Sequence, residues 1–109
     1  MRRRSAIPIE EGGTNVYADL GYANAGEMQR KSQLAAEIAN AIKARKLTQE
    51  AAAELLGMDQ SKISRITRGQ FRGVGETKML ELLAKLGRDV SIVIGPARHR
   101  PGKIDLQFA

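Results

Sequence analysis

Apolar residues recur at helical spacing in two long segments of the chain. The first covers about residues 25–46, where positions four apart are aliphatic: Leu34, Ile38 and Ile42. Asn24 and Glu27 stand at its start with the three-residue spacing of a capping box. The second covers residues 76–86, and its apolar positions follow the i, i+3, i+4, i+7 pattern: Met79, Leu82, Leu83 and Leu86. Because this spacing puts the apolar side chains on one face, we predict two amphipathic helices.

Two shorter helices are predicted between these segments, separated by a turn of three residues. One begins after Thr48, a residue type that caps helix starts, and ends at Gly57, a residue type that ends helices. The next covers residues 59–67, and we expect it to end near Gly69. Small residues are expected where the two helices cross, and aliphatic residues on the buried side of the second. The spacing that indicates a helix-turn-helix is therefore Ala53, Gly57, Ile63 and Ile66.

The period changes from 3.6 to two after Gly87. Residues 89–95 alternate with apolar side chains at Val90, Ile92 and Ile94, and residues 103–109 alternate with Ile104, Leu106 and Phe108. A basic loop rich in proline and glycine, residues 96–103, lies between them. This pattern predicts two β-strands, which either form a hairpin within one chain or pair across a dimer.

The 109 residues are enough for one ordinary domain. We divide them into a flexible basic arm at 1–15, a helix-turn-helix DNA-binding domain at 16–87 and a C-terminal β extension at 88–109. Residues 16–22 are expected to add one helical turn. The arm, which contains three consecutive arginines, is either a frayed terminus, a segment that orders on a protein partner, or a contact for the phosphate backbone.

Composition excludes several classes of protein. The absence of cysteine excludes disulfides and cysteine-ligated zinc, and no apolar run approaches the ~20 residues of a membrane helix. The basic N-terminus is not followed by the apolar region of a signal peptide, so we expect a cytoplasmic protein. The single histidine, His99, lies in a basic loop without nearby carboxylates. We therefore expect no enzyme, no metal site and no cofactor.

Charge and chemistry single out residues 59–68. The net charge is +6, and residues 43–72 hold seven basic and three acidic residues, a balance that favours a polyanionic partner. On a helical wheel, the face opposite the two isoleucines consists of Gln60, Ser61, Ser64, Arg65 and Arg68. Glutamine can pair with adenine, arginine with guanine and serine with either, and small serines let a helix enter the major groove. We therefore predict base contacts by Gln60, Ser61, Ser64 and Arg65; the alternative is a solvated helix face.

The segment LTQEAAAELLGMDQSKISRITRG, residues 47–69, resembles the Xre-like helix-turn-helix family of the Cro and lambda-repressor type. NVYADLGYANAGEMQRKSQLAAEI and LLAKLGRDVSIVIG extend this into a resemblance to the HigA-like antitoxin branch over residues 15–95. The family resemblance implies a mainly α, four- to five-helix lambda-repressor-like domain, to which we add the C-terminal strand pair.

The same resemblance implies a function. Members of the branch are repressors that act as homodimers on double-stranded operator DNA of their own operons and pair with RelE-like ribonuclease toxins. It implies backbone contacts by Gln49 and Arg68, to which we add the neighbouring cations Lys62 and Arg72. A stand-alone Xre-like regulator, or a protein-interaction module that uses the same fold without DNA, remains the alternative.

Overall fold

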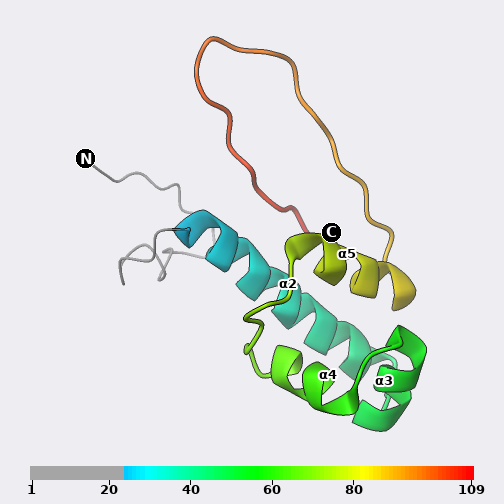
Figure 1. Ribbon diagram of the computed structural model, residues 1–109. Helices are drawn as coiled ribbons and strands as arrows, with labels where there is room; N and C mark the ends of the chain where they lie inside the picture. Colours follow the sequence, from blue (N-terminus) through cyan, green and yellow to red (C-terminus); the bar gives the residue numbers. More distant parts are fainter. Residues whose placement is uncertain (1–23) are drawn as a thin grey trace.

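The computed structural model of the protein describes residues 24–109, and its helices follow the predicted order (Figure 1). They are α2 (Ala25–Ala44), α3 (Gln49–Leu56), α4 (Gln60–Thr67) and α5 (Glu76–Lys85). The long helix α2 contacts both α5 and α4, while α3 packs against α4 and α5. The mainly α fold class is therefore confirmed. The expected arm at 1–15 and helical turn at 16–22 lie outside the described residues.

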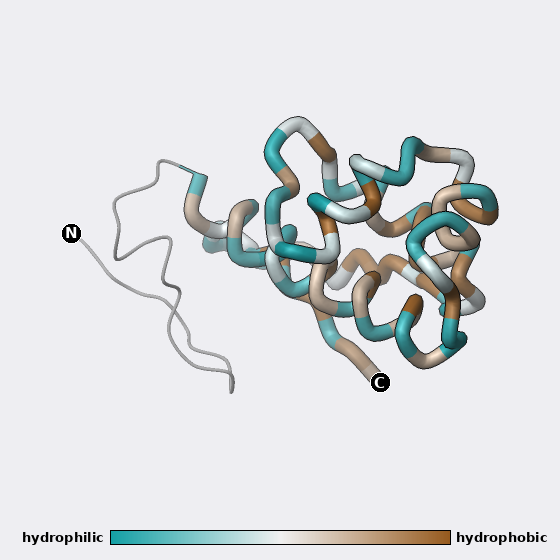
Figure 2. Tube along the Cα trace, turned by 90° about the horizontal axis from the view of Figure 1, so that it is seen from below, coloured by the Kyte–Doolittle hydropathy of each residue, from teal (hydrophilic) through white to brown (hydrophobic). Residues whose placement is uncertain are grey.

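One aliphatic core joins the four helices. The predicted stripe of α2 is buried, and Ile38 is fully inaccessible to solvent. Each of the other helices contributes its apolar side to the same cluster, and hydrophobic and hydrophilic residues alternate along the helical turns in Figure 2. The fully buried side chains with the largest volumes are Leu34, Ile38, Leu56, Ile63, Ile66, Met79 and Leu82. The core is built without tryptophan, as the composition requires.

The helix ends follow the predicted capping residues with one exception. Thr48 Oγ1 accepts a hydrogen bond of 3.0 Å from the backbone N–H of Ala51, which confirms it as the N-cap of α3. Asn24 is the N-cap residue of α2, as predicted, but the predicted capping box is not formed. The side chain of Asn24 makes no capping hydrogen bond there, and its amide instead donates to Glu27 Oε1 at 3.4 Å.

Two ion pairs tie α2 to α5 and its C-terminal end. Arg30 donates from Nε to Glu76 Oε2 at 2.7 Å and from Nη2 to Oε1 at 3.1 Å, so the contact is bidentate. Both side chains are mostly buried, with 16% and 27% of their surface exposed. At the other end, Arg88 Nη1 contacts Glu37 Oε1 at 3.0 Å. These pairs lock the two helices that flank the helix-turn-helix.

The loop between α4 and α5 is also part of the core, which the hydrophobic pattern did not predict. Phe71 and Val74 are buried, with 4% and 5% of their surface exposed. Lys31 of α2 lies over the Phe71 ring, with Nζ 5.8 Å from its centre. The backbone N–H of Gln70 donates to the carbonyl of Arg65 at 2.8 Å, which ends α4 in a compact turn. The sequence signal that could have predicted this burial is the spacing of Phe71 and Val74, three residues apart in QFRGV.

The predicted C-terminal strand pair is not formed. Within the described residues, 24–109, the structure has no β-strand, and residues 88–109 run as an extended, open loop away from the helices and back (Figure 1). A two-stranded ribbon without a third strand or a covering layer is marginal in water, so alternation alone does not close it. The coarse division between a helical part and a non-helical C-terminal segment remains.

Candidate nucleic-acid interface

The helix α4 is held against the core by its two isoleucines. Ile63 and Ile66 are 0% and 1% exposed. Because they lie three residues apart, they occupy one side of the helix and fix its rotation. Every residue on the opposite side is thereby turned toward solvent.

The turn between α3 and α4 sets the angle at which α4 is presented. Gly57 adopts a left-handed backbone conformation with φ 67°, and the backbone N–H of Met58 donates to the carbonyl of Ala53 at 3.0 Å. A Cβ added at Gly57 would meet no atom within 4 Å. Glycine is therefore favoured here by the backbone conformation, whereas the sequence suggested that close helix approach required it. Ala53, with 8% exposure, is the small residue buried at the crossing.

The structure exposes most of the residues predicted to contact DNA bases. Gln60, Ser61 and Arg65 are exposed, and Ser64 is half-buried, its carbonyl accepting a hydrogen bond of 2.9 Å from Thr67 Oγ1. The four side chains lie on one helix of eight residues, so they form one continuous polar surface. This surface matches the outward face that the helical wheel predicts.

Three of the four residues predicted to contact the DNA backbone are exposed. Lys62, Arg68 and Arg72 are exposed, whereas Gln49, the first residue of α3, is half-buried. The amide oxygen of Gln49 is buried without a hydrogen-bond partner. Only the amide nitrogen of glutamine can donate to a phosphate oxygen, so that end of the side chain would make the predicted contact.

The cations of this region are not neutralised by neighbouring carboxylates. The two ion pairs found in residues 24–109 involve Arg30 and Arg88, neither of which is on α3 or α4. Lys62, Arg65 and Arg68 are therefore available to an external anion. A cluster of unpaired, exposed cations beside polar side chains with both donors and acceptors suits a nucleic acid.

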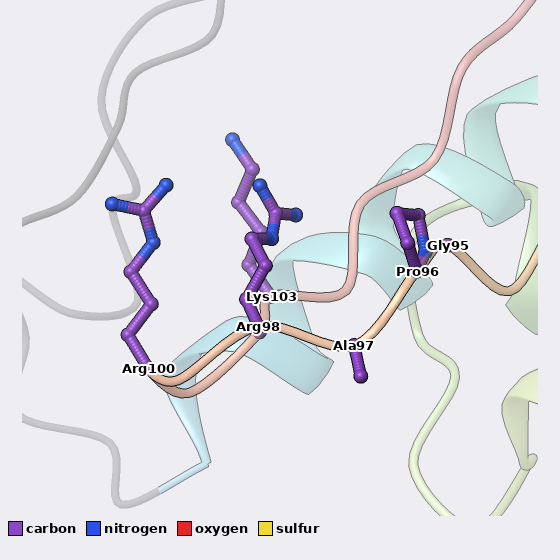
Figure 3. A pocket seen from close by; sticks show the side chains of 7 residues that line it. Gly95, Pro96, Ala97, Arg98, Arg100 and Lys103 are labelled. Carbon is purple, nitrogen blue, oxygen red and sulfur yellow. The ribbon is translucent and has the colours of Figure 1, made fainter.

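A second basic region lies at the turn in the middle of the segment 88–109, farthest from the helices (Figure 1). Figure 3 shows the side chains of Arg98, Arg100 and Lys103 on the same side of the loop. The open hollow here is lined by Gly95, Pro96, Ala97, Arg98, Arg100, Gly102 and Lys103. His99 lies in this loop and is exposed. In residues 24–109 no group of three or more histidine, cysteine, aspartate or glutamate side chains is arranged to hold a metal ion. None of the described helices is both long and apolar enough to span a membrane.

Comparison with known proteins supports the structural reading. A family model described as a helix-turn-helix domain matches residues 16–95. A solved structure described as a putative XRE family transcriptional regulator is similar to this chain, with a TM-score of 0.68 and 30% sequence identity. The match covers 79% of this chain and 97% of that one. No curated protein matches the chain.

Proposed function

Since this chain belongs to the helix-turn-helix domain family, we propose that it is a sequence-specific DNA-binding transcriptional repressor. The observation that carries the proposal is the contrast between the two sides of α4. Its isoleucines are buried in the core, and the other side exposes Gln60, Ser61 and Arg65. A helix that is buried on one side and exposed to solvent on its polar side can enter a major groove about 12 Å wide.

The polar side of α4 would read bases through complementary hydrogen bonds. Gln60 carries a donor and an acceptor on one amide, which matches the N6 and N7 edge of adenine. Arg65 presents two parallel donors, which match O6 and N7 of guanine. The short side chains of Ser61 and Ser64 keep the helix backbone close to the groove floor, so that longer neighbours reach the base edges.

The residues around α4 would hold the phosphate backbone. Lys62, Arg68 and Arg72 are exposed cations, and Gln49 at the start of α3 can donate from its amide nitrogen. Such contacts supply affinity and fix the orientation of the protein without reading sequence. Their effect is to make binding depend on salt, because each neutralised phosphate releases counterions.

The experiment that tests the proposal is binding to the DNA upstream of the protein's own gene, measured over a series of salt concentrations. We expect affinity to fall steeply as salt rises, and Arg65→Ala to reduce discrimination at one base position by about 1–3 kcal/mol. Lys78→Ala is the matched control, since Lys78 is an exposed cation on α5. Absence of salt-sensitive binding, or equal effects of the two substitutions, would contradict the proposal.

A finer proposal follows from the resemblance over residues 15–95. We propose that the protein is the antitoxin of a toxin–antitoxin pair, acts as a homodimer on its own operator and binds a RelE-like toxin. The supporting observation is sequence similarity in the segments that flank the helix-turn-helix. A small RelE-like reading frame beside the gene, whose product co-purifies with this protein, is the expected result.

The alternatives make different predictions. A stand-alone Xre-like regulator binds its operator in the same way but has no toxin gene as a neighbour. A protein-interaction module has neither operator binding nor sensitivity to Arg65→Ala. The exposed, unpaired cations of α4 favour the DNA-binding proteins over the last of these.

A further inference from the structure

The C-terminal segment exposes more aliphatic side chains than the surface of a monomeric domain normally does. Residues 89–109 are exposed except at Leu106, and the exposed fractions reach 74% for Ile92, 87% for Ile94 and 71% for Ile104. The backbone N–H of Arg88 bonds to the carbonyl of Leu83, but within the described chain residues 89–109 make no backbone hydrogen bond. Unpaired backbone groups beside exposed apolar side chains mark a protein–protein contact.

Most of the large apolar side chains of this segment lie on one face once it is paired, and Val93, 87% exposed, lies on the other. In an extended chain successive side chains point to opposite faces, so alternate residues share one. If the two limbs pair as an antiparallel ribbon, that face carries Val90, Ile92, Ile94, Ile104, Leu106 and Phe108. Leu106 already packs against the helical core, so the helices supply part of the cover for this face.

We propose that the partner is a second copy of this chain, and that residues 89–95 of the two copies pair antiparallel about a two-fold axis at Ile92. Residues 103–109 then form the two outer strands of a four-stranded sheet shared by both copies. This inference deepens the proposed function and rests on it, because a repressor that reads two half-sites about 34 Å apart has to be two-fold symmetric.

Charge decides which limb lies at the centre. In the limb 89–95 the only charged side chain is Asp89 at its first position, and residues 90–95 are uncharged, whereas the returning limb contains Lys103 and Asp105. Charged residues on an outer strand oppose further strand addition, and an uncharged, β-branched strand suits a central position. The segment 89–95 therefore fits the centre, and 103–109 fits the edge.

Charge also decides the direction of pairing. The loop between the limbs places Arg98, Arg100 and Lys103 on one side, as Figure 3 shows. Parallel pairing would put the two basic loops next to each other. Antiparallel pairing about Ile92 puts them at opposite ends of the sheet, where the two sets of like charges are well separated.

The size of the segment fits a second copy. In the proposed arrangement residues 89–95 of each copy form the contact between copies, and residues 103–109 add one outer strand from each. Three or more strands are needed for a stable small sheet, and two ribbons supply four. A single chain provides only two, and in the structure of the single chain the segment is open (Figure 1).

Disulfide trapping in the full-length chain tests this arrangement, because the native sequence has no cysteine. Directly opposite residues in an antiparallel pair have Cα atoms about 4.5–5.5 Å apart, within the range of a disulfide. Ile92→Cys is therefore expected to cross-link under mild oxidation without DNA. Ile104→Cys is the matched control, because the outer strands would lie three strand spacings, about 14 Å, apart.

The expected result is a dimer by sedimentation and cross-linking at least about tenfold faster for Ile92→Cys than for Ile104→Cys, since only the first pair satisfies disulfide geometry. Unchanged helical circular dichroism verifies that both variants fold. A monomeric protein, equal rates, or no cross-link at residue 92 would overturn the pairing. Selective cross-linking without operator binding would instead overturn the proposed function and leave the pairing intact.

Discussion

Individual residues on α4 differ in role because of their angle around the helix axis. Ile63 is fully buried and Arg65, two positions later, is exposed. Since successive residues turn by about 100°, neighbours in sequence reach different environments. The chemistry of the exposed residues then separates base readers, which carry directional donors and acceptors, from cations that recognise phosphate by charge.

Substitution of Gln60 and Arg68 is expected to separate these two roles. Gln60→Ala should reduce the free-energy difference between the preferred base and other bases at one position by about 1–3 kcal/mol. It should leave the salt dependence of DNA affinity almost unchanged. Arg68→Ala should weaken binding to all sequences alike and lower the slope of log affinity against log salt by about 1. Binding to operator variants with single base changes, at several salt concentrations, measures both. The same pattern for the two variants would show that the assignment is wrong.

At the scale of elements, the turn between α3 and α4 sets the angle between the two helices and so makes them a helix-turn-helix. Thr48 caps the start of α3, and the left-handed conformation of Gly57 ends it. The chain can then reverse into α4 within three residues while Ala53 is buried at the crossing. The orientation of the polar face therefore depends on one backbone conformation as well as on the buried isoleucines.

Gly57→Ala is expected to destabilise the protein by about 1–2 kcal/mol. The cost arises from the positive φ and not from a clash, because a Cβ at this position would meet no atom within 4 Å. Gly26→Ala is the control: Gly26 lies inside α2, where alanine is favoured over glycine by up to about 1 kcal/mol. Urea unfolding measures both. Equal effects of the two substitutions would contradict the role assigned to the Gly57 conformation.

At the scale of the whole molecule, contacts between residues distant in sequence hold together α2 and α5, the two helices against which α3 and α4 pack. Arg30 and Glu76 are 46 positions apart in sequence and form a bidentate pair between α2 and α5. The hydrogen bond to Glu76 raises the pKa of Arg30, partly opposed by burial. A raised pKa means that the folded state holds this proton more tightly. The stabilisation from Arg30 is therefore present below its unfolded pKa and is lost only in strong alkali.

Glu76→Gln is expected to lower the free energy of unfolding by about 1–3 kcal/mol, because it removes the charge that compensates a mostly buried guanidinium. Glu81→Gln, on the same helix, is the control; Glu81 is exposed and its substitution should change stability by less than about 0.5 kcal/mol. Thermal and urea unfolding at neutral pH measure the difference. Indistinguishable stabilities would show that the pair contributes no net stability.

Local information in the sequence was sufficient for the helices and for most of the candidate interface. The i, i+4 recurrence of Leu34, Ile38 and Ile42 predicted the buried side of α2, and the spacing of Ile63 and Ile66 predicted the orientation of α4. Both depend on the constant geometry of a helix, so a pattern within one segment determines them. Asn24 is at the predicted N-cap position, but the capping box did not form, because a single side chain can choose between nearby partners.

Turn residues and helical periodicity act within a few positions, so local sequence predicts where the four helices lie, to within two residues at their ends, and which side of α4 is polar. The tertiary structure alone decided that Arg30 meets Glu76 and that Phe71 is buried beneath Lys31. It also decided that residues 88–109 remain open in a single chain. These features require groups that are distant in sequence, or a further strand, to come together. Alternation shows that a segment can form a strand, but pairing depends on the backbone beside it.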